Sequence, residues 1–131
     1  MTAIISSLIG LIVIAAVVLF LVWKKQRRRK LSTSSVRRLR RQWAMLEGMQ
    51  DPHRKIIDAE KIVDSALEEL GYTGTFADKL RSAGPRLKNP QALWEAHKLR
   101  NRIAHDLNIS FSEKDIRIAL QAFDRALGSL S

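Results

Sequence analysis

The chain begins with a long apolar run that contains no charged residue. It extends from Ala3 to Trp23, a run of 21 residues, and about 20 apolar residues are enough for a helix to cross a bilayer. A secretory signal peptide carries its charges before the apolar run and a small-residue cleavage site after it, whereas here the charges follow the run. We therefore expect residues 1–23 to form a retained single-pass transmembrane anchor, with a span of about 3–23.

Beyond residue 32, apolar residues recur every three or four positions, which is the spacing of a helix with one buried face. No segment alternates with period two. The expected helices are one that carries Val36, Leu39, Trp43 and Leu46, one that begins at Asp51 and Pro52 and ends at Gly71, a short one that begins at Thr75, one from Asn89 to Leu107, and one that begins at Ser112 and ends near Gly128. The starting residues are typical helix caps. The pattern predicts an all-α protein, with a bundle of four to five helices over residues 33–131.

Charge is distributed very unevenly along the chain, whose net charge is +10. Residues 24–41 contain ten basic and no acidic residues, whereas residues 42–131 contain thirteen of each. Basic residues that flank a span mark its cytoplasmic side and attract anionic lipid headgroups. We expect a single-pass protein of the inner cell membrane, with the N-terminus outside and the bundle in the cytoplasm. The juxtamembrane segment 24–32 is expected to contact lipid headgroups through Lys24, Lys25, Arg27, Arg28, Arg29 and Lys30.

The helix expected over residues 89–107 places one arginine on its apolar face. At 100° per residue, its apolar side chains form one arc, made of Leu93, Ala96, Leu99, Ile103, Ala104 and Leu107. Arg100 lies inside this arc. A guanidinium in such a position packs its stem in the core and needs a carboxylate partner. The candidates on the second helix of the bundle are Glu60, Asp64 and Glu68.

Three further polar residues follow one flank of the same arc, at intervals of one helical turn. They are His97, Asn101 and His105. The two histidines are separated by eight residues, about 12 Å along a helix, and no acidic residue shares their row. The chain also contains no cysteine, which removes thiolate chemistry and cysteine-based metal sites. We therefore expect neither a metal nor a cofactor at this row.

The stretch "RNRIAH", from Arg100 to His105, resembles the signature of the HEPN superfamily. That signature is an arginine, four to six residues of which the first is polar, and a histidine. The surrounding "LWEAHKLRNRIAHD" is similar to a group of small membrane-anchored bacterial HEPN-like proteins. The resemblance implies a HEPN-like bundle that pairs as a homodimer through the motif helix.

The resemblance also implies roles for the residues of the motif. In active family members, two copies of the motif form a metal-independent endoribonuclease site. Arg100 would bind the scissile phosphate, and His105 would act as general base or acid toward the RNA. Asn101 would position the site, and His97 would contact phosphate or support the other residues.

Two functions remain open from the sequence. One is an RNA-cleaving toxin or defence-type ribonuclease at the inner membrane face. The other is a non-catalytic dimerisation or binding module, in which the polar row forms a buried interface network. The sequence departs from toxins that are paired with a nucleotidyltransferase, because Leu107 stands where those toxins carry a tyrosine. Residues 42–131 carry no net charge, so this part of the chain also lacks the basic surface typical of tight RNA binding.

Overall fold

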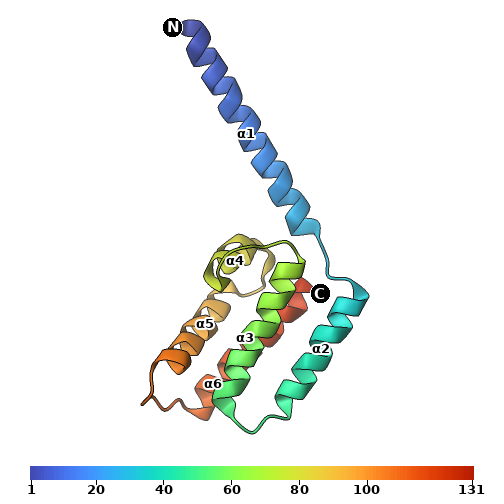
Figure 1. Cartoon of the computed structure of the whole chain (residues 1–131), viewed down its shortest axis with the longest axis vertical. Coiled ribbons are helices and arrows are strands. Elements are labelled where there is room, and N and C mark those ends of the chain that lie inside the picture. The colour runs from blue at the N-terminus through green and yellow to red at the C-terminus, as the bar shows by residue number, and fades with distance from the viewer.

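The computed structural model describes the side chains of residues 1–25 and 29–131, and the fold is all-helical (Figure 1). No β-strand is present in this part of the chain. The elements are α1 (Thr2–Arg28), α2 (Thr33–Glu47), α3 (Pro52–Glu69), α4 (Phe76–Ala83), the 3-10 turn η1 (Gly84–Arg86), α5 (Pro90–His105) and α6 (Glu113–Leu130). The predicted all-α class is confirmed.

Helix α1 extends away from the other helices, which form a bundle (Figure 1). Its segment Thr2–Lys25 is long and apolar enough to cross a membrane, and none of it is buried within the protein. Large apolar side chains along the helix are exposed from Ile4 to Val22. Since a soluble protein rarely leaves so large a continuous apolar surface uncovered, α1 has the composition and exposure of a membrane anchor.

The helices begin at the residues that the sequence predicts, because each start has a capping side chain. The side chains that accept a hydrogen bond from a backbone N–H of the first turn are those of Ser32, Asp51, Thr75, Asn89 and Ser112. Thr75 and Ser112 form complete capping boxes, with Asp78 and Asp115 respectively. Gly71 follows α3 with a φ of 90°, a conformation that glycine adopts without strain.

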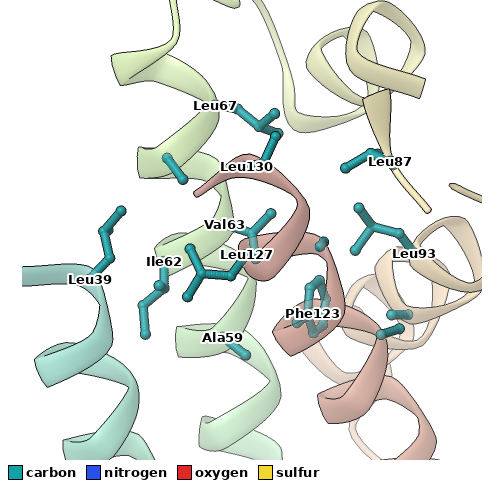
Figure 2. Close-up of a cluster of buried hydrophobic side chains, with 14 of the residues drawn as sticks. Leu39, Ala59, Ile62, Val63, Leu67, Leu87, Leu93, Phe123, Leu127 and Leu130 are labelled. Atoms are coloured by element: carbon teal, nitrogen blue, oxygen red, sulfur yellow. The ribbon is translucent and has the colours of Figure 1, made fainter. Parts of the chain in front are cut away.

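The core lies between α3 and α6, and α2 and α5 pack on either side (Figures 1 and 2). Figure 2 shows the central layer, in which Val63 and Leu67 of α3 face Leu127 and Leu130 of α6. All four side chains are fully buried. Burial of each such side chain contributes about 1.5–3 kcal/mol relative to exposure. The core therefore holds α3 and α6 as the rigid centre on which α5 is mounted.

Helix α5 packs less deeply than the sequence predicts. It ends at His105, and among its side chains only Leu93 and Ala96 are buried. Ala104 and Leu107 are exposed, so their predicted place on the buried face is wrong. The physical reason is that the last turn of α5 extends beyond the core that covers its first turns, and Leu107 follows the end of the helix.

Candidate functional site

Glu60 is a buried carboxylate at the contact between α3 and α5. It is 6% exposed, because it shares the inward face of α3 with Ile56 and Val63, which are both fully buried. The spacing of four and three residues between them places all three on one side of the helix. Two side chains of α5 lie against its oxygens: Oε2 lies at hydrogen-bond distance, 2.8 Å, from His97 Nδ1, and Oε1 forms an ion pair with Arg100, 3.2 Å from Nε.

Asn101 completes a network with these three residues, which we call the α3–α5 polar ring (Glu60, His97, Arg100 and Asn101). Its Nδ2 is 3.3 Å from His97 Nε2, and its Oδ1 accepts from Arg100 Nη1 at 3.4 Å. With Glu60 ionised, Nδ1–H of His97 must donate to the carboxylate, which leaves Nε2 free to accept from the Asn101 amide. The contacts of His97 with Glu60 and Asn101 are therefore both hydrogen bonds when His97 is neutral.

Arg100 is held by the ring at one edge and open at the other. Its Nε is buried and forms no hydrogen bond, although it lies within ion-pair distance of Glu60. The N–H bond therefore does not point along the line to the carboxylate, and the attraction is mainly one of charge. The side chain is 27% exposed, and Nη2 forms no hydrogen bond or ion pair with the described residues. The guanidinium keeps donors for a further acceptor, such as a phosphate or a carboxylate from another molecule.

Two aromatic side chains lie against the His97 member of the α3–α5 polar ring. The centroid of the His97 imidazole is 5.1 Å from the centroid of the Phe76 side chain and 6.0 Å from that of the Trp94 side chain. His97 is accordingly only 13% exposed. Burial raises the pKa of Glu60 above its ordinary value of 4.5, and the hydrogen bond from His97 and the charges of His97 and Arg100 offset this only in part. The ring therefore holds a carboxylate in surroundings that disfavour its charge.

His105 lies apart from the ring. It is the last residue of α5 and is exposed, and it forms no hydrogen bond, ion pair or ring contact with the described residues. Five residues separate it from Arg100, which corresponds to 140° around a helix of about 100° per residue. The structure thus brings His97, Arg100 and Asn101 together and leaves His105 outside. Within one chain, the arginine and histidine of the motif do not form a joint site.

The other two predicted partners of Arg100 have a different role. Asp64 and Glu68 accept from Lys79 Nζ of α4, at 2.8 and 2.7 Å. Burial of Lys79 would lower its pKa, but the hydrogen bonds and charges of the two carboxylates outweigh this effect and raise it. The sequence analysis missed Lys79 and the burial of Glu60. Helical spacing could have indicated both. Lys79 stands three residues after Phe76 and next to Leu80, on the apolar side of α4, and Glu60 shares a helix face with Ile56 and Val63.

The described members of the predicted lipid-contact group lie near the end of α1 and in the connector that follows it. Lys24, Lys25, Arg29 and Lys30 are exposed. The predictions for Arg27 and Arg28 lie outside the described side chains. Among the described residues, no group of three His, Asp or Glu side chains is placed to hold a metal ion.

Comparison of the chain with protein-family models, with curated proteins and with solved structures finds no match. The HEPN resemblance therefore stays a prediction from the motif in α5. The homodimer and the RNA contact that follow from it stay predictions as well. The contacts of α5 described above are the basis for the function proposed next.

Proposed function

We propose that this protein is a membrane-anchored helical module that pairs with a second copy of itself through α5. The observation that supports this most strongly is the exposed end of the apolar arc of α5. Leu93 and Ala96 are buried at the start of the helix, whereas Leu99 and Ile103 are only half-buried. Farther along, Ala104 and Leu107 are exposed. The apolar side chains are thus covered at the start of α5 and exposed at its last turn and just beyond it.

The polar ring supports this proposal because it makes α5 a rigid platform. Two contacts from Glu60 on α3 fix His97 and Arg100, so the outer half of α5 is held although few of its apolar side chains are buried. The open edge of Arg100 then faces outward beside the exposed apolar residues. Arginine beside apolar side chains is a frequent combination at the centre of protein interfaces, where its remaining donors bind a partner's carbonyl or carboxylate.

A second copy of the chain is the partner that the architecture favours. Anchoring by α1 confines all copies to one bilayer and presents their bundles at the same height, which raises their effective concentration. A two-fold contact uses the same patch on both copies, so a single exposed patch on α5 is sufficient. A two-fold contact places the patch against its own copy, and each Arg100 guanidinium then binds an acceptor of the other copy, such as a backbone carbonyl, because two guanidinium groups side by side repel each other.

The test is the mass of the full chain in detergent micelles, measured by light scattering with the detergent contribution subtracted. We expect a dimer for the natural chain and monomers for Ala104→Glu and Leu107→Asp, because these changes place charge on the patch without touching the core. Met45→Asp is the matched control, since Met45 is exposed to 75% on α2. A monomeric natural chain, or equal dissociation of the control, contradicts the proposal.

A second candidate function is metal-independent RNA cleavage. It is favoured by two side chains, Arg100 and His105, whose hydrogen-bonding groups are not all used within the chain. Arg100 has an unused guanidinium edge, and His105 has an exposed imidazole with no partner among the described residues. If α5 helices pair, Arg100 of one chain and His105 of the other can flank one phosphate. His105 would take the proton of the 2′-hydroxyl, whose oxygen attacks phosphorus to form the 2′,3′-cyclic phosphate, and the 5′-oxygen leaves with a proton from water. Arg100 would stabilise the charge on the phosphate in the transition state.

Cleavage is tested with the full chain in lipid vesicles and single-stranded RNA in the presence of EDTA. Ribonuclease activity predicts 2′,3′-cyclic phosphate ends, which disappear in His105→Ala and Arg100→Ala. His105→Ala is the decisive variant, because this exposed side chain has no contact whose loss would unfold the bundle. His53→Ala is its control, since His53 is an exposed histidine on α3. If no cleavage occurs, the non-catalytic function stands alone.

A further inference from the structure

The connection between α1 and the bundle is short and packed. Helix α1 ends at Arg28 and α2 begins at Thr33. Within the four residues between them, the side chain of Leu31 is buried in the core cluster, and the backbone carbonyl of Arg29 accepts a hydrogen bond from Arg86 Nη2 of η1. The first residues after the span are therefore part of the bundle, and the turn η1 lies next to the end of α1.

The exposed basic residues around this junction carry charge that the described residues do not neutralise. Lys30 of the connector, Arg37 of the first turns of α2 and Lys88 after η1 are exposed and form no ion pair with the described residues. The junction thus adds basic side chains of the bundle to those at the end of α1. The two groups are far apart in the sequence, and the contact between Arg29 and Arg86 joins them in space.

The acidic residues at the same end of the bundle are already paired. Asp64 and Glu68 share Lys79, Glu69 binds Arg38, and Asp78 binds Arg81. These groups together carry one negative charge, and the three positive charges of Lys30, Arg37 and Lys88 exceed it. An anionic membrane surface attracts such a surplus at about 1 kcal/mol per basic residue, and the attraction falls off within a Debye length. The short connector keeps these residues within that range.

We propose that the α4–η1 end of the bundle docks on the membrane surface and binds the headgroups of anionic phospholipids through Lys30, Arg37 and Lys88. The proposal rests on the membrane anchor of the proposed function and does not depend on pairing through α5. It gives the bundle one orientation. The loop between α5 and α6 then lies at the end farthest from the bilayer (Figure 1).

The test uses the full chain, which has no natural cysteine, so that one introduced cysteine carries a fluorescent donor. Ser82→Cys places the donor on α4, and Ser110→Cys places it on the α5–α6 loop; both side chains are exposed. The protein is reconstituted into vesicles of phosphatidylcholine with or without phosphatidylglycerol, and a headgroup dye is the acceptor. We expect greater energy transfer from position 82 than from position 110, and an increase at position 82 with phosphatidylglycerol.

Charge variants distinguish docking through the α4–η1 end from attraction of any basic residue of the bundle to the anionic membrane. Lys30→Gln with Lys88→Gln is expected to lower the ratio of docked to undocked bundle about five-fold for each charge removed. Lys114→Gln with Arg117→Gln is the matched control on α6, because both side chains are exposed and form no ion pair with the described residues. Equal effects of the two pairs, or equal transfer from positions 82 and 110, overturn the proposal.

Two further arms identify the cause of a negative result. Inorganic phosphate added at constant ionic strength is expected to leave the energy transfer unchanged, and a decrease would assign the basic end to free phosphate instead of lipid. Flotation with neutral vesicles tests the anchor on its own. A protein that fails to float contradicts the anchor and with it the docking, whereas a protein that floats without phosphatidylglycerol-dependent transfer contradicts the docking alone.

Discussion

Glu60 and His97 stand 37 residues apart in the chain, yet a carboxylate oxygen of one lies 2.8 Å from Nδ1 of the other. This contact joins α3, at the centre of the core, to α5, which buries only two side chains of its own. The same carboxylate holds Arg100 through its second oxygen. Glu60 therefore adds a polar attachment to the apolar packing of α5 against the core.

Removal of this carboxylate should loosen α5. Glu60→Ala leaves His97 without its acceptor and Arg100 without its ion-pair partner and creates a small void, and we expect a loss of about 2 kcal/mol in the free energy of unfolding. A fully buried pair would lose about 3–5 kcal/mol, but Arg100 is partly exposed and regains water. Chemical denaturation of the full chain in detergent micelles measures the change. Glu95→Ala, an exposed glutamate of α5, should change stability by less than about 0.5 kcal/mol; a similar loss in both variants would contradict this account of Glu60.

The pKa of Glu60 predicts how stability depends on pH. Burial raises this pKa in the folded chain above the ordinary value of 4.5, so the folded state binds the proton more tightly than the unfolded state. The resulting contribution to stability is complete below pH 4.5 and is lost as the pH rises through the folded-state pKa. As the pH rises from 4.5, the melting temperature of the natural chain should therefore fall relative to that of Glu60→Gln. A difference that does not change with pH contradicts the predicted shift.

Lys79 should be a second point of sensitivity. Lys79→Met keeps the length of the buried stem but removes the ammonium that Asp64 and Glu68 share. Because both carboxylates are partly exposed and can be hydrated again, we expect a loss of about 1–2 kcal/mol, less than for a pair that is buried on both sides. Thermal unfolding of the full chain measures it. Lys98→Met is the control, since Lys98 forms only an exposed pair with Glu95 within α5 and should have almost no effect.

Much of the bundle could be predicted because local signals agree with one another. Caps such as Asn89 and Ser112 coincide with the start of each apolar repeat, so the beginnings of α5 and α6 follow from the sequence. The end of α5 does not. The apolar repeat continues through Ala104 and Leu107, and periodicity alone cannot show that the core stops before them.

The candidate site could be predicted only in part, for a similar reason. The wheel identifies Arg100 as the inward arginine and offers three carboxylates as partners, and the structure selects Glu60. That choice depends on which face of α3 packs against α5. It also depends on Lys79, which binds Asp64 and Glu68. Such competition between distant residues is not visible in local spacing. The separation of His105 from the ring likewise depends on where α5 ends.

The most direct test of the central claim, pairing through the open end of α5, uses the absence of natural cysteines. The full chain in membrane vesicles carries Ala104→Cys, Leu107→Cys or Met45→Cys and is treated with a mild oxidant. A disulfide requires Cα atoms within about 7 Å, so a single cysteine reacts efficiently only where its position lies beside the same position of the second copy, near the two-fold axis. The account predicts covalent dimers on a non-reducing gel for positions 104 and 107 and monomers for position 45. Monomers at all three positions, or dimers at position 45 alone, would contradict it.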